Sequence, residues 1–232
     1  MNIKILPSKI SGTIVAPSSK SITHRAIIMA ALAHDTSIIK NVLLSDDTKY
    51  TIKALQQLGV PIKQRGTTVT IHGTNGQLTT PQKPIFVGNS ASSLRLLTAI
   101  STLANGKTII TGEKRLKERP IEDLQDVLQQ KEIHTGGEIK IRGDISSQYI
   151  SALLVIAPFA KRAVKITIEK DLLSKPYVAL TIDVMKKFGI NVKNNNFKNL
   201  IVESGQRYQG RKYIVEGDYS SASYFFAAKA LT

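Results

Sequence analysis

The chain has 232 residues, of which 42% are hydrophobic and none is Cys, and its 32 Lys and Arg against 17 Asp and Glu give a formal net charge of +15. This composition is typical of a globular protein and excludes disulfides, thiolate nucleophiles and Cys-ligated zinc. The charge excess indicates an anionic partner, either a nucleic acid or an acidic small molecule.

The basic residues are dispersed along the chain. They occur as short pairs such as Lys186-Lys187 and Arg211-Lys212, without a long basic run or interleaved aromatic residues. This pattern favours a small anion over a nucleic acid, which stays as an alternative. The first residues lack the apolar stretch of a signal peptide, and no apolar segment is long enough to span a membrane. We therefore expect a soluble, cytoplasmic protein that contacts neither a membrane nor a nucleic acid.

Four segments share one design, in which a turn with Gly or Pro and a Ser-rich stretch precede an apolar helix pattern. They begin near residues 17, 88, 143 and 217 and read APSSKSITHRAIIMAALA, GNSASSLRLLTAISTLA, GDISSQYISALLVIAPFA and GDYSSASYFFAAKALT. An internal repeat of this kind predicts similar structural units that pack on one another.

The same order of elements follows the first and the third of these segments. The patterns after the first predict a strand, an amphipathic helix and a strand pair, over residues 37–43, 46–59, 60–66 and 67–73. The patterns after the third predict the same elements over residues 163–170, 176–189, 190–195 and 199–204. Each complete unit is therefore expected to be βαβαββ-like.

The middle unit is shorter than its neighbours. Its start and the next one are 55 residues apart (88 to 143), against 71 (17 to 88) and 74 (143 to 217). The predicted helix over residues 120–130 runs into the next strand without a complete strand pair, which places the deficit between Gln130 and Gly137. The fourth unit stops after its first helix, so we expect the chain to be part of a longer protein.

The Ser-rich helix starts are candidate anion sites. Ser at such a place usually caps unpaired backbone N–H groups and does nothing more. If repeated units point four such helix starts at one place, their N–H donors and positive dipole ends together form a site for phosphate or carboxylate. Ser21 and Arg25 share one helix face, with Lys20 beside them.

Further donors occur near the other helix starts. Neutral hydroxyl and amide groups suit a polyol or a phosphate ester. The remaining candidates are Arg95, the loop cations Arg115, Lys117 and Arg119, and the neutral donors Ser146, Ser147, Gln148, Ser174 and Tyr177. No HExxH, GxSxG or Walker sequence occurs, and His24, His34, His72 and His134 show no metal-ligand spacing, so no metal site is expected.

Six motifs occur in the order SKSITHRA, GNSASSLR, RLKERPI, SSQYISALL, SKPYVALT and VEGDYSSASYF. Together they resemble the 5-enolpyruvylshikimate-3-phosphate synthase family over essentially the whole chain. The resemblance implies a transferase of aromatic amino-acid biosynthesis. It would move the enolpyruvyl group of phosphoenolpyruvate to the 5-hydroxyl of shikimate 3-phosphate through a tetrahedral intermediate. Phosphate would be released, and no cofactor would be needed.

The resemblance also implies an α/β fold with parallel helices and mixed four-stranded sheets. Family members have two similar domains, each with three βαβαββ units around a pseudo-threefold axis. By this pattern residues 13–216 form the first domain, and residues 1–12 and 217–232 belong with a second domain. The three units of the first domain would span about 13–83, 84–142 and 143–216. The full-length protein would be a monomer.

Individual roles follow from the resemblance. Shikimate 3-phosphate would be bound by Lys20, Ser21, Arg25, Ser146, Ser147, Gln148, Ser174 and Tyr177. Phosphoenolpyruvate would be bound by Lys20, Asn89, Ala91, Arg119 and Gln148, with Arg95 in support. Lys20 would touch both substrates and act electrostatically as the catalytic residue. The acidic proton-shuttling residues of the family lie in the second domain, so we expect these 232 residues to bind substrate weakly and to lack appreciable turnover.

Two points distinguish this sequence among related enzymes. Ala91 stands where many family members have Gly, and its methyl group is expected to narrow the phosphoenolpyruvate site and reduce the binding of the bulkier inhibitor glyphosate. A sister class, the UDP-N-acetylglucosamine enolpyruvyl transferases, shares the fold and is a second alternative. That class typically uses an active-site Cys, which this chain lacks.

Overall fold

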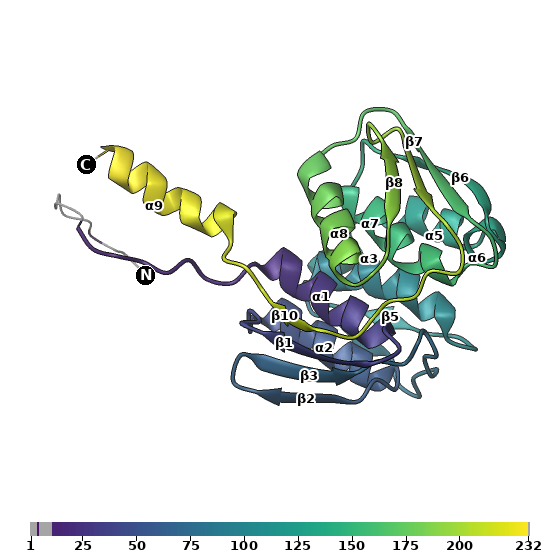
Figure 1. Cartoon of the computed structure of the whole chain (residues 1–232), viewed down its shortest axis with the longest axis horizontal. Helices are drawn as coiled ribbons and strands as arrows, with labels where there is room; N and C mark the ends of the chain where they lie inside the picture. Colours follow the sequence, from purple (N-terminus) through teal and green to yellow (C-terminus); the bar gives the residue numbers. More distant parts are fainter. Residues whose placement is uncertain (1–3, 5–10, 232) are drawn as a thin grey trace.

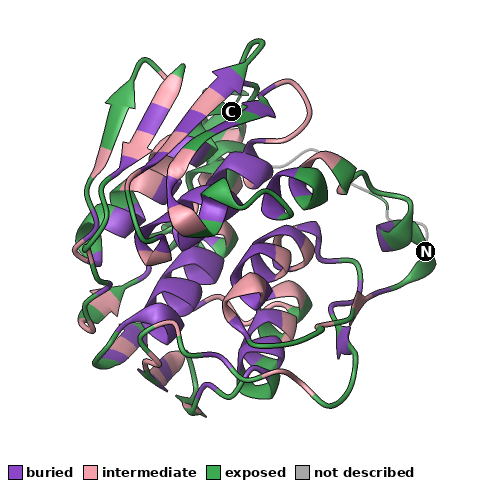
Figure 2. Ribbon diagram, turned by 90° about the vertical axis from the view of Figure 1, so that its right-hand side faces the viewer, coloured by how far each residue is buried: buried purple, intermediate pink, exposed green. Residues whose placement is uncertain are grey.

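Buried helices occupy the centre of the fold, and β-sheets cover them from outside (Figures 1 and 2). The computed structural model describes residue 4 and residues 11–231. The central helices are α1 (Lys20–Leu32), α3 (Ala91–Ile100) and α7 (Ser147–Ile156). Nearly every residue of α1 and α7 is buried. A helix that is apolar on all sides belongs in a core, which explains their position between the other elements.

The first sheet has four strands in the order β10 (Lys212–Ile214), β1 (Thr36–Lys40), β3 (Thr68–His72) and β2 (Ile62–Arg65). Strands β10 and β1 are parallel, whereas β1–β3 and β3–β2 are antiparallel. Helix α2 (Asp46–Gln57) connects β1 to β2 and begins with a capping box at Ser45. The strands and helix predicted after the first Ser-rich segment are therefore confirmed.

The sheet of the third unit repeats this arrangement. Its order is β6 (Gly137–Arg142), β7 (Val164–Glu169), β9 (Asn199–Val202) and β8 (Val192–Asn195), with one parallel pair followed by two antiparallel pairs. Helix α8 (Lys175–Lys187) connects β7 to β8. The predicted α/β class with mixed four-stranded sheets is confirmed.

The middle unit has a two-stranded parallel sheet of β4 (Ile85–Phe86) and β5 (Ile110–Thr111). Three short helices follow, α4 (Lys114–Lys117), α5 (Glu122–Leu128) and α6 (Glu132–Thr135), and one-turn 3₁₀ segments end α3 at Ser101–Leu103 and α7 at Ala157–Phe159. Within the described residues this unit has no final strand pair, as its short spacing indicates.

Two strands belong to a different sheet from the one that the expected unit boundaries imply. The spacing assigns β6 to the end of the middle unit (84–142), but β6 is hydrogen-bonded to β7 of the third sheet along its whole length. The spacing likewise assigns β10 to the third unit (143–216), but β10 pairs with β1 of the first sheet. The second and third units therefore take their first strand from the segment that precedes their Ser-rich helix, whereas the first unit takes it from β10, near the other end of the described chain.

Helix α9 (Tyr219–Leu231) extends away from the other helices and sheets, beside the N-terminal segment (Figure 1). None of its residues is buried, and Tyr219, Tyr224 and Phe226 are largely exposed. An isolated antiparallel bridge joins Ser18, just before α1, to Gly217, which lies between β10 and α9. The predicted segment 1–12 lies, except for residues 4, 11 and 12, outside the described residues.

Candidate anion-binding site

A cavity of about 430 Å³ lies where the N-terminal ends of α1, α7 and α8 meet. Every residue that the resemblance assigns to shikimate 3-phosphate lines this anion cavity. Ser92, Ile145 and Leu173 complete it. The full lining is Lys20, Ser21, Arg25, Ser92, Ile145, Ser146, Ser147, Gln148, Leu173, Ser174 and Tyr177. The structure thus brings together residues that are separated by as much as two thirds of the chain.

Neighbouring Ser residues at the helix starts have separate tasks. Ser19 caps α1 by accepting the backbone N–H of Ile22, and Ser90 caps α3 in the same way. Ser21 and Ser147 follow the caps of α1 and α7 and line the cavity without serving as the N-cap. Capping therefore accounts for Ser19, Ser90 and Ser146, and leaves Ser21 and Ser147 for a ligand.

Arg25 is buried in the wall of this cavity with neutral partners. Its guanidinium donates to the hydroxyl of Thr181 (2.7 Å), the carbonyl of Ser21 (3.0 Å) and the hydroxyl of Ser151 (3.3 Å). None of the ion pairs in the described chain includes Arg25. Burial lowers the pKa of Arg25 to about 10, so the group stays charged at neutral pH. A buried cation without a counter-ion is stabilised by an anionic ligand.

Lys20 has a carboxylate partner on the neighbouring helix. Its Nζ lies 2.8 Å from Oδ2 of Asp47, which stands in the first turn of α2. Asp47 is favourable there because the N-terminal end of a helix carries partial positive charge. Lys20 lies at the corresponding end of α1, where a cation is unfavourable for the same reason. The ion pair compensates for the cationic start of α1 and holds the Lys20 ammonium group at the mouth of the cavity.

Arg95 supports the opposite wall from α3. Its Nη1 donates to Oε1 of Gln148 (2.8 Å) and to the hydroxyl of Ser146 (3.2 Å), and Nη2 donates to the carbonyl of Pro120 (3.2 Å). The guanidinium also lies over the ring of Tyr149, 5.1 Å from its centroid. Arg95 thereby fixes two side chains that line the cavity, although it is not itself part of the lining.

Ser174 has a strained backbone. Its φ of 57° and ψ of 44° place it in the left-handed helical region, and its hydroxyl does not cap α8. This conformation costs about 1–2 kcal/mol for a residue with a Cβ atom. The conformation directs Ser174 into the cavity lining. A residue kept in this region at a cavity is consistent with a role in binding.

Three residues that the resemblance assigns to phosphoenolpyruvate lie outside the lining of the anion cavity. The amide of Asn89 donates to the carboxylate of Glu113. Ala91 is the buried first residue of α3. Arg119 is exposed and lines a second cavity of about 310 Å³. The structure therefore assembles the whole first group of candidates, and of the second group only Lys20 and Gln148.

Sequence reasoning missed Ser151 and Thr181, which hold the Arg25 guanidinium. Their spacing offered a signal, because each lies one helical turn after a cavity residue. Ser151 follows Ser147 by four positions and Thr181 follows Tyr177 by four, as Arg25 follows Ser21. Residues four apart share one face of a helix. A second polar residue four positions after a cavity residue, inside an otherwise apolar helix, thus indicates a side chain that supports the cavity wall from behind.

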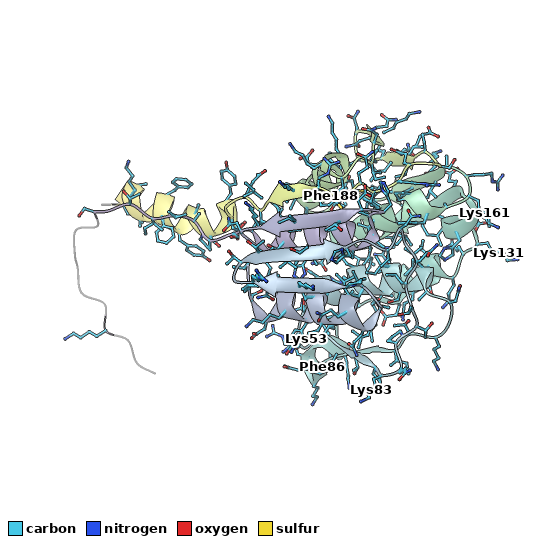
Figure 3. All side chains as sticks on the ribbon, turned by 60° about the horizontal axis from the view of Figure 1, so that its bottom comes forward. Lys53, Lys83, Phe86, Lys131, Lys161 and Phe188 are labelled. Carbon is cyan, nitrogen blue, oxygen red and sulfur yellow. The ribbon has the colours of Figure 1, made fainter. Side chains whose placement is uncertain are left out.

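The cations outside the site are dispersed, as the sequence indicates. Figure 3 shows Lys131 and Lys161 at one end of the molecule and Lys53 and Lys83 at another. Across the described part of the chain, no group of three or more His, Cys, Asp or Glu residues could hold a metal ion. The helices of that part are too short or too polar to cross a membrane.

Comparison with known proteins identifies the family of this chain. A protein-family model described as EPSP synthase (3-phosphoshikimate 1-carboxyvinyltransferase) matches residues 6–232. Relatives named 3-phosphoshikimate 1-carboxyvinyltransferase are 41% identical in Pseudoalteromonas translucida, over 97% of this chain, and 42% identical in Shewanella piezotolerans, over 96% of it. A solved EPSP synthase structure from Acinetobacter baumannii superposes with a TM-score of 0.80 and 25% identity, over 95% of this chain and 53% of that one.

The chain spans 58% of the length of these two relatives. The alignment with the Pseudoalteromonas protein extends over 246 residues, whereas 97% of the 232 residues of this chain is about 225. About 21 aligned positions therefore have no residue in this chain. This number is close to the 16 and 19 residues by which the spacing of the middle unit (55) falls short of the other two (71 and 74). The comparisons favour neither a nucleic-acid-binding module nor a UDP-N-acetylglucosamine enolpyruvyl transferase. The family model and the relatives show that this chain belongs to the EPSP synthase family.

Proposed function

We propose that this protein binds shikimate 3-phosphate in the anion cavity and acts in the transfer of the enolpyruvyl group of phosphoenolpyruvate to its 5-hydroxyl group. The observation that carries the proposal is the lining of one cavity by cations and hydroxyl groups, with no carboxylate among them. The names of the relatives support the reaction. Ser146, Ser147 and Ser174 bind the phosphate of this substrate, and Ser21 and Arg25 hold its remaining polar groups.

Phosphoenolpyruvate binds beside the first substrate in this proposal. Lys20 and Gln148, which line the cavity, face it, and Arg119 and the start of α3 at Ala91 approach it from the middle unit. Asn89 shapes the loop before α3 through its bond to Glu113. Fixed donors in a closed site stabilise the charge that develops as the 5-hydroxyl oxygen attacks the enol carbon and phosphate departs.

The proposed reaction also needs proton transfers, because the attacking hydroxyl group loses a proton and the methylene carbon gains one as the tetrahedral intermediate forms. The resulting methyl group then loses a proton as phosphate departs, which restores the double bond. General acid–base catalysis requires a suitable titratable group near the reacting atoms. No carboxylate or histidine occurs among the residues that line the anion cavity. We propose that residues 13–216 form one domain, that residues 217–232 begin a second, and that this second domain supplies the proton-transferring groups. The exposed aromatic residues of α9 are consistent with packing against further protein.

Calorimetric titration of the 232-residue chain tests the binding proposal. We expect saturable binding of shikimate 3-phosphate, weaker binding of inorganic phosphate, and no measurable release of phosphate when phosphoenolpyruvate is added. Ser147→Ala should weaken the binding, whereas Ser223→Ala on the exposed helix α9 is a matched control that should not. Absence of binding at millimolar substrate would contradict the site, and phosphate release by the chain would contradict the need for a second domain.

A titration with duplex DNA at increasing salt tests the alternative. A nucleic-acid-binding protein loses affinity steeply as salt rises, because phosphate contacts release counter-ions. We expect only weak association with DNA and no competition between DNA and shikimate 3-phosphate. Tight DNA binding that Ser147→Ala leaves unchanged would favour the alternative.

A further inference from the structure

Strand β5 lacks a neighbour that its counterparts have. In the two complete sheets the strand after the central helix is paired on both sides, β1 with β10 and β3, and β7 with β6 and β9. Strand β5 follows the central helix α3 in the same way, but within the described residues it pairs only with β4. Its missing neighbour belongs to the strand pair that the short middle unit does not have. A strand that is central in the other two sheets is therefore left at the edge of this one.

The backbone groups on the free edge of β5 follow from its bonds to β4. The carbonyl oxygens of Ile109 and Thr111 accept the N–H groups of Ile85 (2.8 Å) and Val87 (2.9 Å). Successive backbone groups of a strand point to opposite edges, so the N–H and C=O groups of Ile110 point away from β4. The second cavity, which Ile110 lines, lies on this side. An extended segment placed there can pair with the edge.

The sequence does not protect this edge. Native sheets protect exposed edges with charged residues, above all Lys, because an unprotected edge pairs with other chains. In contrast, residues 108–111 read TIIT, which is uncharged and rich in the β-branched residues that favour strands. Every outer strand of the two complete sheets contains a Lys, namely Lys212 in β10, Lys63 in β2, Lys140 in β6 and Lys193 in β8.

The charges on either side of this segment identify its partner. Lys107 precedes the segment and Glu113 follows it, and both are exposed. When two copies of the chain pair antiparallel about Ile110, positions equally far before and after Ile110 lie opposite each other. Lys107 of each copy then faces the partner subunit's Glu113, and opposite charges across a strand pair are favourable. We propose that β5 pairs with β5 of a second copy of this chain to form a two-fold symmetric dimer.

The remaining contacts fit this arrangement. An antiparallel neighbour is what β1 has in β3 and what β7 has in β9. Ile109, which is 50% exposed, lies opposite the partner subunit's Thr111 and loses part of its contact with water. The Asn89 amide uses Oε2 of Glu113, which leaves Oε1 for the Lys107 ammonium group. Because the same edge is used on both copies, the assembly closes at two chains. The resemblance implies a monomer, and the shortened unit is the reason that this chain differs.

Sedimentation of the 232-residue chain tests the proposal. Physiological ionic strength is used, because the net charge of +15 on each copy opposes association and is screened beyond about 8 Å. We expect a reversible change from one chain to two as the concentration rises to the submillimolar range. Hydrogen exchange of the Ile110 amide should slow as the dimer forms. The Val87 amide is the control, because its bond to Thr111 already exists in the single chain.

Charge exchange tests the direction and register of the pairing. Lys107→Glu places like charges opposite each other at both ends of the strand pair and should weaken the dimer about tenfold. Glu113→Lys should do the same. An equal mixture of the two variants restores opposite charges at both ends and should form a dimer again. Lys161→Glu is the matched control, because Lys161 is exposed and lies in none of the ion pairs of the described chain. It makes the same change in net charge away from β5 and should not weaken the dimer.

Four results would overturn the proposal. These are a single chain at every concentration, a dimer that Lys107→Glu does not weaken, a mixture of the two variants that stays monomeric, and assemblies of more than two chains. The second result would assign association to another surface, such as the exposed helix α9. Should Glu113→Lys fail to fold, Lys107→Glu and the exchange of Ile110 still decide the outcome. Strand β5 contributes no residue to the lining of the anion cavity, so failure here leaves the proposed binding of shikimate 3-phosphate untouched.

Discussion

Arg25 Nε donates to the hydroxyl of Thr181 at 2.7 Å, and this bond joins residues 156 positions apart in the chain. Thr181 also donates to the carbonyl of Tyr177 (2.9 Å) and pairs with the hydroxyl of Ser151 (2.8 Å). Helices α1, α7 and α8 thus meet at one guanidinium group behind the anion cavity. The group is held by neutral oxygens, which leave its charge available to a ligand.

Thr181→Val should therefore weaken both folding and binding. It removes the acceptor of a buried charged donor, and we expect a loss of about 2 kcal/mol in the free energy of unfolding. Affinity for shikimate 3-phosphate should fall about tenfold as the guanidinium moves. Urea unfolding and calorimetry measure the two effects. Thr181→Ser keeps the hydroxyl group and should retain most of the affinity. A Val variant that binds as tightly as the unmodified chain would show that Thr181 does not position Arg25.

Ser174→Gly should separate stability from binding. Glycine adopts the left-handed conformation of this residue (φ 57°) at no steric cost, so the free energy of unfolding should rise by about 1 kcal/mol. Loss of the hydroxyl group should reduce the affinity for shikimate 3-phosphate about fivefold. Asn75→Gly, at another residue of positive φ (52°), is the control and should leave affinity unchanged. Unchanged affinity in Ser174→Gly would remove Ser174 from the binding site.

His24 should make the protein less stable in mild acid. Its side chain is buried on α1, with Nδ1 2.9 Å from the hydroxyl of Thr51, and burial lowers its pKa from 6.5 to about 3, with a smaller contribution from Arg25. Above pH 6.5 His24 is neutral in both the folded and unfolded states. Between the two pKa values the unfolded chain binds a proton that the folded chain does not, so stability falls as the pH decreases.

Urea unfolding should show a loss of about 2 kcal/mol from this group between about pH 7 and about pH 5. His24→Gln should remove that pH dependence, whatever its effect on stability at pH 7. His134→Gln is the control, because desolvation lowers the pKa of His134 as well but its side chain is exposed. An unchanged slope in His24→Gln would assign the effect to other groups.

Ala91→Gly should increase the binding of glyphosate. Ala91 is buried at the first position of α3, and its methyl group is proposed to narrow the phosphoenolpyruvate site. Removal of one methyl group from a fitted pocket changes the affinity for a bulkier ligand about tenfold. Calorimetry with glyphosate in the presence of shikimate 3-phosphate measures the change. Ala99→Gly, in the same helix, controls for helix propensity. Equal glyphosate affinity in Ala91→Gly and the unmodified chain would reject the steric explanation.

Much of the fold follows from local sequence. The apolar stretches that become α1, α3 and α7 each follow a Ser-rich turn, and the alternating segments near β1, β3, β7 and β9 form strands as predicted. Local patterns suffice here because helix caps and side-chain periodicity act within a few residues. The candidates assigned to shikimate 3-phosphate were also identified from sequence, through motifs at the starts of α1, α7 and α8.

Contacts between distant segments required the tertiary structure. The sequence by itself determined which helices begin with Ser and which residues carry charge. Only the packed chain placed Asp47 beside Lys20, Thr181 behind Arg25, and β6 beside β7. It also placed Arg119 at a second cavity. The reason is physical: a cap or a strand pattern is stabilised by its neighbours in sequence. The partner of a buried charge or of a sheet edge is instead fixed by how whole helices and sheets pack together.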